Sequence, residues 1–325
     1  MKLAMLGAAH VHASEYVQVC KTIPDVEFTQ IYDANLGTAK RIAELCDATA
    51  TDDPLTCLSP AIDAVVICSE NYRHVELVQS AALAGKDILC EKPLATNVAD
   101  AQELVTLCSR LGVQLQTAFP CRYHPTIART KELIDQGLLG EILAVRATNQ
   151  GQIPGGWFAD PLLAGGGALM DHTVHVVDLL RFLLHDEFDS VFAYSATRFH
   201  DVKTEDSAFL SMTLKNGVIV TLDPSWSRPL SYPTWGNVTM ELVGTEGTLF
   251  VDMFSQNMEF YSTSSYQWLP FGTNMNRLML IDFVERLQQK QPVAITGEDG
   301  LRATEVVAAA YLSVKTGTLC SITHV

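Results

Sequence analysis

Val65-Val66-Ile67-Cys68 and Asp87-Ile88-Leu89-Cys90 are short, apolar stretches that read as two buried β-strands. The segment between them has helical periodicity, so the region predicts a strand, a crossover helix and a second strand, the βαβ unit of a parallel sheet. Glu91-Lys92-Pro93 follows at the carboxyl end of the second strand, where open α/β sheets bind their ligands, and its proline ends the strand. We therefore expect chemistry at this Glu-Lys pair, although a solvated pair in a loop explains the spacing about equally well.

Composition limits the classes of protein to consider. With 325 residues the chain exceeds one typical core, and we expect two domains, residues 1–120 and 121–325. The net charge is −15 and no basic cluster occurs, so we expect no nucleic-acid partner. Eight scattered cysteines without a C-x-x-C pair indicate reduced thiols. Residues 3–9 are too few for a signal peptide, and no apolar run reaches about 18 residues, so we expect a cytoplasmic protein without membrane contact.

The first turn of the chain resembles a phosphate-binding turn. Residues 2–7 predict a buried strand and residues 14–21 a helix, with Gly7-Ala8-Ala9-His10-Val11-His12 between them. This turn keeps only the first glycine of G-x-G-x-x-G, yet the unpaired N–H groups of a helix N-terminus can still hold a pyrophosphate. We predict cofactor contacts from Gly7, Ala9, His10 and Val11.

Asp33 ends the next predicted strand, residues 26–32, where dinucleotide folds place their ribose-binding acid. Its carboxylate would accept hydrogen bonds from a ribose 2′-OH and repel a 2′-phosphate. No arginine follows in Ala34-Asn35-Leu36 to receive such a phosphate. The sequence thus favours NAD over NADP. The alternative interpretation of Asp33 is a turn residue that caps the next helix.

Strands and helices alternate up to residue 120. The periodicity predicts further helices at residues 38–45 and 97–111, and strands at residues 48–50 and 113–118. Six strands in this arrangement predict a doubly wound parallel sheet.

A second candidate site lies on the helix predicted over residues 168–184, which Gly165-Gly166-Gly167 opens. Asp171 and His175 are four residues apart and share one face, with Asp178 three further on. A carboxylate one turn from an imidazole can fix its tautomer and raise its basicity, as a general base requires. On the residues alone, a surface Asp–His pair is the commoner explanation. His172 should point about 100° away from Asp171.

Histidines at positions 10, 12, 172 and 175 raise the possibility of a metal site. No H-E-x-x-H motif or Cys/His quartet accompanies them, so we expect no metal.

The second half of the chain predicts a largely antiparallel sheet. Segments of period two occur at residues 190–197, 208–214, 218–222, 238–243, 248–252 and 258–261. Asn216-Gly217 and Glu246-Gly247 separate pairs of them as hairpin turns. One face of this sheet would pack on helices and the other would be free for assembly. Before it, residues 125–136 predict a helix and residues 141–148 a strand, and helices at residues 275–289 and 301–315 close the chain.

The combination resembles the glucose–fructose oxidoreductase/inositol dehydrogenase/rhizopine-catabolism (Gfo/Idh/MocA) family over nearly the whole chain. The resemblance is carried by Ile62-Asp63-Ala64-Val65-Val66-Ile67, Asn71, His74, Ala84-Gly85-Lys86, Cys90-Glu91-Lys92-Pro93-Leu94-Ala95, Arg122 with Pro125, Gly137-Leu138-Leu139-Gly140, and Gly165-Gly166-Gly167-Ala168-Leu169-Met170-Asp171 with His175 and Asp178. It implies an α/β protein with an N-terminal Rossmann domain and a C-terminal α/β domain with an open, largely antiparallel sheet. The glycine-poor phosphate turn and His172 depart from the family pattern.

The resemblance also implies a function. Lys92, Asp171 and His175 resemble the family's catalytic residues, and further cofactor contacts are implied for Ser69, Asn71, His74, Glu91 and Lys92. The expected reaction is reversible hydride transfer between NAD and a secondary hydroxyl or keto group of a sugar, cyclitol or related polyol. His175 would take the hydroxyl proton, Asp171 would orient it, and Lys92 would stabilise the charge on the reacting oxygen. A homodimer or homotetramer built through the C-terminal sheet is implied as well.

Candidate substrate residues are Arg122, Tyr123, Trp157, Phe158 and His172. An aromatic ring there can stack on a sugar face, and burial in the core explains Trp157 and Phe158 about equally well. Two other functions stay open: redox-assisted hydrolysis or elimination on a sugar derivative with tightly bound NAD, and NAD-binding regulation without turnover. The joint presence of Lys92, Asp171 and His175 argues against a regulator.

Overall fold

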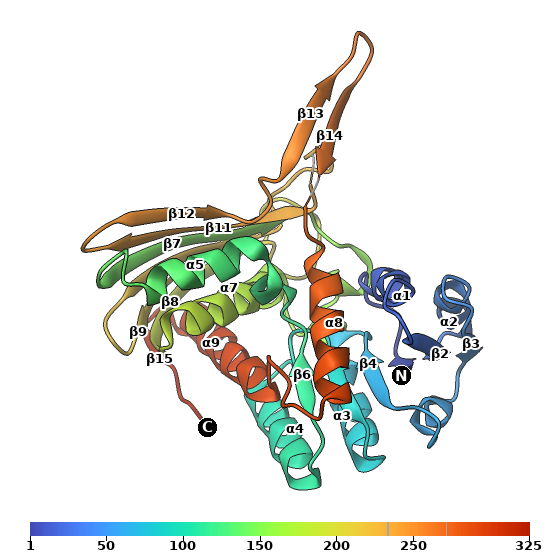
Figure 1. Cartoon of the computed structure of the whole chain (residues 1–325). Coiled ribbons are helices and arrows are strands. Elements are labelled where there is room, and N and C mark those ends of the chain that lie inside the picture. The colour runs from blue at the N-terminus through green and yellow to red at the C-terminus, as the bar shows by residue number, and fades with distance from the viewer. Residues whose placement is uncertain (233, 271) are drawn as a thin grey trace.

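A six-stranded parallel sheet forms the first part of the chain (Figure 1). The computed structural model describes residues 1–232, 234–270 and 272–325. The strands pair in the order β3-β2-β1-β4-β5-β6, which confirms the doubly wound sheet. Their bounds are β1 (Lys2–Leu6), β2 (Glu27–Tyr32), β3 (Thr49–Thr51), β4 (Ala64–Ile67), β5 (Asp87–Cys90) and β6 (Leu115–Thr117).

Helices cover both faces of this sheet. They are α1 (Ala13–Cys20), α2 (Leu36–Ala43), α3 (His74–Leu83) and α4 (Val98–Leu111). Along β1, Leu3 and Met5 enter the apolar core under α1 and α2, whereas Ala4 and Leu6 enter the core under α3 and α4. Burial on both faces explains why residues 3–6 of β1 and all of β4 are apolar rather than alternating.

A late helix returns to the first domain. α8 (Met275–Gln288) lies beside α1, and its Met279, Leu280 and Phe283 belong to the same core (Figure 1). The division at residue 120 stays a prediction, but this helix shows that residues after 121 complete the core of the parallel sheet.

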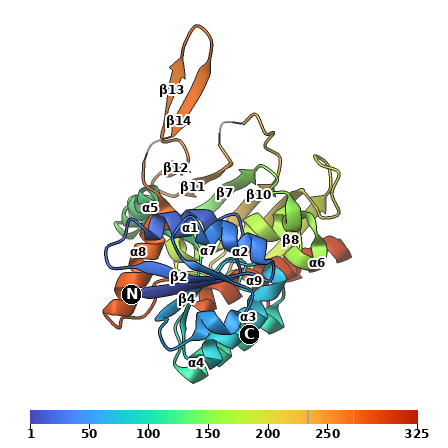
Figure 2. The same ribbon diagram turned by 90° about the vertical axis from the view of Figure 1, so that its right-hand side faces the viewer.

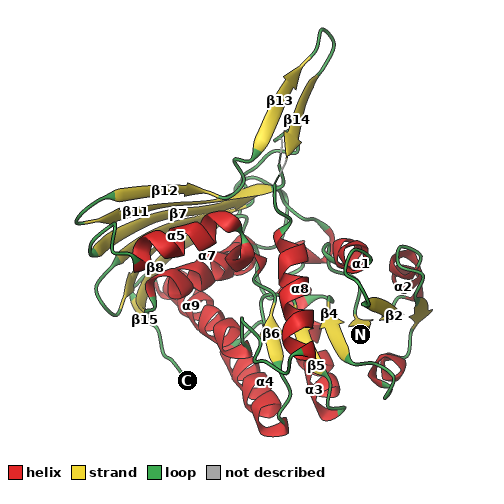
Figure 3. Ribbon diagram, viewed as in Figure 1, coloured by secondary structure: helices red, strands yellow, loops and turns green. Residues whose placement is uncertain are grey.

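The second sheet has seven strands in the order β12-β11-β7-β10-β9-β8-β15. All its pairs are antiparallel except β7 with β10. The helices α5 (Pro125–Asp135), α7 (Ala168–Leu184) and α9 (Gly297–Thr316) lie against one face, and the other face is open (Figures 1 and 3). The strands are β7 (Ile142–Gly151), β8 (Phe188–Ala196), β9 (Ser207–Leu214), β10 (Ile219–Ser225), β11 (Gly236–Gly244), β12 (Thr248–Asp252) and β15 (Cys320–Ser321).

The segment predicted at residues 258–261 is a strand, but its expected place in the large sheet is wrong. β13 (Asn257–Tyr261) pairs with β14 (Tyr266–Pro270), and the hairpin projects away from the body (Figures 1 and 2). A period of two identifies a strand without identifying its partner, which is why the sequence misplaced β13 and missed β14. Within the described residues, no helix is both long and apolar enough to cross a membrane.

Three consecutive glycines bring α7 close to its neighbours. Gly165 has a φ of +80°, which L side chains rarely adopt. A Cβ on Gly166 would lie 1.9 Å from the hydroxyl of Tyr311, and a Cβ on Gly167 would lie 1.9 Å from the carbonyl oxygen of Glu205. The three glycines therefore allow the N-terminus of α7 to pack closely against Tyr311 and Glu205.

We predict that Gly167→Ala destabilises the fold by about 1–3 kcal/mol, because the new methyl group meets a backbone oxygen that cannot move freely. Gly37→Ala is the matched control, since the nearest atom to its Cβ is a side-chain oxygen of Asn35 at 3.0 Å. Denaturant unfolding of both variants measures the difference. Equal free energies of unfolding for the two variants would contradict this explanation.

Candidate active site

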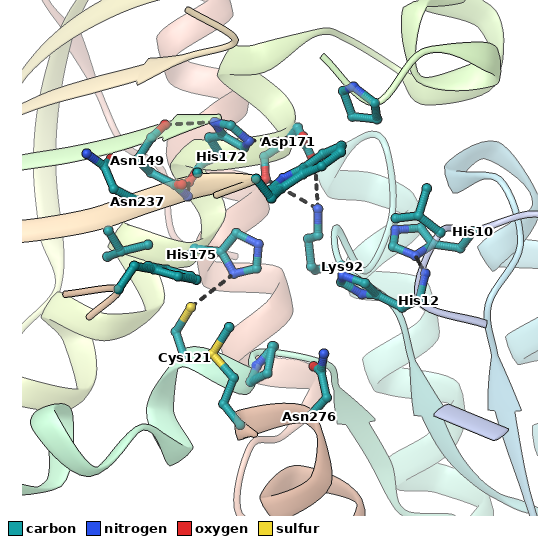
Figure 4. A pocket seen from close by; sticks show the side chains of 18 of the residues that line it. His10, His12, Lys92, Cys121, Asn149, Asp171, His172, His175, Asn237 and Asn276 are labelled. Carbon is teal, nitrogen blue, oxygen red and sulfur yellow. Dashed lines mark hydrogen bonds and ion pairs between the residues drawn. The ribbon is translucent and has the colours of Figure 1, made fainter. Parts of the chain in front are cut away.

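Side chains from two distant segments converge beside one cavity (Figure 4). Lys92 follows β5, and Asp171 and His175 lie on α7; all three line the cavity. The ammonium group of Lys92 forms an ion pair with the carboxylate of Asp171, and both side chains are at least nine-tenths buried. We call this the catalytic cavity, because the resemblance implies catalytic roles for these three residues.

Asp171 is held as a charged group. Its Oδ2 accepts a hydrogen bond of 3.1 Å from Nε1 of Trp226. Burial raises the pKa of Asp171, but the charge and hydrogen bond of Lys92, together with His172 and His175, lower it by more in total, and the net pKa is below its usual value. The carboxylate thus remains ionised and fixes the ammonium group in the cavity.

Two expectations about α7 are wrong. His172 does not point away from Asp171: its Nε2 lies 3.3 Å from Oδ2 of Asp171, because its Nδ1 is bonded to the carbonyl oxygen of Asn149 at 2.7 Å. In the described residues Asp171 also makes no hydrogen bond to His175, since its carboxylate turns to Lys92 and Trp226 instead. Helical spacing gave a shared face but not the directions of the side chains.

His175 is arranged as a neutral imidazole. Its Nδ1 faces Sγ of Cys121 at 4.0 Å, and the ring's other edge turns toward Lys92 (Figure 4). Burial and the charge of Lys92 hold the pKa of His175 well below 6.5. The ring is therefore unprotonated at neutral pH and able to accept a proton.

The phosphate turn is close to the end of β4. Gly7 has a φ of +82°, and a Cβ there would lie 2.3 Å from Cβ of Ser69. The N–H groups of Ala9 and Val11 have no hydrogen-bond partner in the part of the chain that the structure describes. His10 and Val11 line the catalytic cavity.

Buried polar atoms without partners gather at the same sheet edge. They are Nε2 of His10, Oδ1 of Asn71 and Nε2 of His74, each unpaired among the described residues. Unsatisfied buried groups are rare in proteins, and a partner outside the chain is one explanation for them. A dinucleotide presents the hydroxyl and phosphate groups that such atoms and free amides bind, so the residues present fit this cofactor.

Asp33 lies at the end of β2 beside the turn. Its Oδ2 accepts a hydrogen bond of 2.9 Å from the N–H of Ala8, and its Oδ1 accepts one of 2.9 Å from the N–H of Asn35. The side chain that caps α2 is that of Asn35. Arg73 reaches the hydroxyl of Tyr32 from the loop after β4, but it is paired with Glu76.

Glu91 turns away from the cavity toward α1. Its Oε1 lies 2.8 Å from Nδ1 of His12 and accepts a 2.5 Å hydrogen bond from Tyr16. His10, Cys68 and Glu91 each place one potential metal-ligand atom within 4.8 Å of the others. Burial raises the pKa of the Cys68 thiol well above 9.0, so this thiol remains protonated and is a poor ligand.

The predicted substrate residues divide into two groups. Phe158 and His172 line the catalytic cavity, and Trp157 stacks on Phe158 while its Nε1 donates to the carbonyl oxygen of Ala9 at 3.1 Å. Arg122 and Tyr123 do not line it. The guanidinium of Arg122 binds Asp178 and Asp299, and the hydroxyl of Tyr123 donates to Asp282.

Several residues of the cavity were missed from the sequence. Cys121 faces His175, and further polar or aromatic wall residues are Asn149, Trp235, Asn237, Phe254 and Asn276; behind the wall, Trp226 fixes Asp171. They lie at strand ends, in loops and on α8, and no motif marked any of them.

Comparisons with known proteins agree with this geometry. The NAD-binding Rossmann-fold model of the oxidoreductase family matches residues 1–119, and the GFO/IDH/MocA C-terminal domain model matches residues 127–250. D-glucoside 3-dehydrogenase of Escherichia coli is 29% identical over 98% of this chain and 96% of its own. Myo-inositol 2-dehydrogenase of Thermotoga maritima is 25% identical over 97% of this chain and 96% of its own.

Solved structures show the same fold. GenD2 from gentamicin A biosynthesis, in complex with NAD, superposes with a TM-score of 0.92 at 24% identity, covering 100% of this chain and 97% of that chain. Levoglucosan dehydrogenase in complex with NADH gives a TM-score of 0.86 at 21% identity, covering 100% of both chains. The resemblance seen in the sequence is confirmed: the chain is an oxidoreductase of the Gfo/Idh/MocA family with an NAD-binding Rossmann domain.

Proposed function

We propose that the protein transfers a hydride reversibly between NAD and a secondary hydroxyl or keto group of a sugar, cyclitol or related polyol. The observation that carries this proposal is the shared cavity of the Lys92–Asp171 ion pair and the neutral imidazole of His175. The names of the relatives, which include inositol and glucoside dehydrogenases, support the substrate class.

Each catalytic residue has a distinct role in this proposal. Bound NAD supplies the hydride acceptor or donor. His175 takes the proton of the substrate hydroxyl, and Lys92 donates a hydrogen bond to the reacting oxygen and stabilises its negative charge. Asp171 holds the ammonium group of Lys92 in place rather than orienting His175, as its hydrogen bonds indicate.

The cavity wall suits a polyhydroxylated ring. Phe158 and the half-exposed Trp235 offer apolar ring faces, and His172 and the amides of Asn237 and Asn276 offer polar atoms. Oδ1 of Asn276 is buried without a partner among the described residues. Alternating aromatic faces and hydrogen-bonding groups match the C–H faces and hydroxyl groups of a sugar.

For the cofactor we propose contacts from the phosphate turn, from Ser69, Asn71 and His74 after β4, and from Lys92 after β5. The direct contact expected from Glu91 is not proposed, because its carboxylate is turned toward α1 and bonded to His12 and Tyr16. Asp33 would exclude a 2′-phosphate and so favour NAD over NADP. All eight cysteines are free thiols, which supports our proposal of a reducing, cytoplasmic location.

We also propose that the open face of the large sheet joins copies of the chain into a homodimer or homotetramer. Tyr194 on β8 and Phe209 on β9 are paired across the strands and are 67% and 64% exposed, and Phe250 on β12 is 66% exposed. Exposed aromatic rings of this kind on one face are typical of interfaces.

Lys92→Ala tests the catalytic assignment. We expect turnover to fall by roughly 10²–10³ because a preorganised donor to the developing charge is lost, while NAD binding stays measurable. The assay follows reduced-nicotinamide absorbance with a panel of polyols and keto-sugars, and Lys21→Ala on the surface is the control. Near-normal turnover of the Lys92 variant would remove it from the mechanism. Wild-type product formation without net change in the cofactor would point to hydrolysis or elimination instead.

Phe209→Glu tests the assembly surface. We expect the wild-type chain to be a dimer or tetramer by light scattering after size-exclusion chromatography, and the variant to shift toward monomer because a charge replaces an apolar contact. A wild-type monomer at micromolar concentration would contradict the proposal, as would a variant of unchanged mass.

A further inference from the structure

His12 occupies an unusual place in the phosphate turn. It takes the position of the third glycine in the dinucleotide pattern and is the N-cap residue of α1. Its side chain, 27% exposed, lines both the catalytic cavity and a second, more open cavity beside Glu15 and Asn274. Figure 4 shows His10 and His12 on the side of the catalytic cavity opposite His175.

Glu91 holds the imidazole of His12 in a defined orientation. Its buried carboxylate lies 2.8 Å from Nδ1 of His12, and the hydroxyl of Tyr16 donates to the same oxygen at 2.5 Å. Since Nδ1 faces Glu91, Nε2 is the edge left for a ligand, and it has no hydrogen bond within the described residues. The ring is thus fixed at one edge and open at the other.

The charges around His12 favour its protonated form. Burial lowers the pKa of His12, but the charge and hydrogen bond of Glu91 raise it more, and the net pKa is above 6.5. By contrast, burial lowers the pKa of the adjacent His10 to about 3. The titratable or charged groups that face His12 are Glu91 and Lys92 after β5, Glu15 and Tyr16 on α1, His10 in the turn, His124 across the open cavity, and Asp171, His172 and His175 on α7.

A second, independent observation points to a ligand here. Nε2 of His10 is buried, lines the same cavity and has no partner among the described residues. The N–H groups of Ala9 and Val11 are also free in that part of the chain. These donors and the N-terminus of α1 surround the place where Rossmann domains bind the pyrophosphate.

We propose that His12 is a cationic contact for the diphosphate of the dinucleotide, and that its charge makes dinucleotide affinity depend on pH. This turn lacks the glycines that let the backbone approach the diphosphate closely. Attraction between the diphosphate and the imidazolium of His12 compensates for their absence. The inference rests on the NAD-binding Rossmann domain and not on the identity of the substrate.

The direction of the pH effect follows from the charge. Below the pKa of His12 the ring is an imidazolium and attracts the anionic diphosphate; above it the ring is neutral and the attraction is lost. A charge-assisted hydrogen bond of this kind corresponds to roughly ten-fold in affinity. We therefore expect the dissociation constant of NAD to rise about ten-fold between pH 6.5 and pH 9.

Titration calorimetry of NAD at both pH values tests the proposal directly. His12→Asn is the informative variant, because the Asn amide nitrogen keeps the place of Nδ1 beside Glu91 and Asn remains a good N-cap. We expect it to bind NAD at both pH values with the wild-type affinity of pH 9. Glu91→Gln removes the charge that favours the imidazolium. In this variant we expect NAD affinity to fall at a lower pH than in the wild type. His185→Asn, on the exposed C-cap of α7, is the matched histidine control and should behave as wild type.

Two further ligands identify the group that His12 contacts. NADH and ADP-ribose share the diphosphate with NAD, so both should show the same ten-fold change in the wild-type protein. A change that ADP-ribose does not share would place the effect at the nicotinamide ring and overturn the proposal. A His12→Asn variant that keeps the pH dependence, or a wild-type affinity that is equal at both pH values, would also overturn it. A wild-type protein that binds none of the three ligands would contradict the proposed cofactor itself.

Discussion

The buried ion pair between Lys92 and Asp171 joins the two halves of the molecule. One partner follows β5 of the parallel sheet, and the other lies in the first turn of α7, under the second sheet. Removing two charges from water is costly, and loss of either partner leaves the other uncompensated in the interior. The pair therefore favours one relative position of β5 and α7, in which the imidazole of His175 and the ammonium group face the same cavity.

The histidines around this cavity show how position determines charge. His10 and His175 are buried near the Lys92 ammonium group, and their pKa values are lowered. His12 is bonded to Glu91, and its pKa is raised. One cavity thus has a neutral proton acceptor on α7 and a histidine favouring the charged form beside the phosphate turn. The first suits general-base chemistry, and the second suits an anionic cofactor.

Much of this arrangement was predictable from the sequence. Runs such as Val65–Cys68 specified buried parallel strands, and the helix over residues 168–184 was predicted with its exact bounds. Side-chain directions were not predictable, because they depend on partners that lie far away in the chain. Arg122 and Tyr123 were expected to contact the substrate, yet Asp178 and Asp282 draw their polar groups away from the cavity. Trp226 reaches Asp171 from the end of β10, a contact that no local pattern encodes.

In the proposed function, one nicotinamide ring is flanked by groups from both halves of the chain. A crystal structure of the protein with bound NAD tests it most directly. We expect the nicotinamide to lie in the catalytic cavity, in contact with Lys92 and within reach of His175. A nicotinamide bound outside this cavity, with the Lys92–Asp171 pair and His175 facing solvent or protein alone, would contradict it.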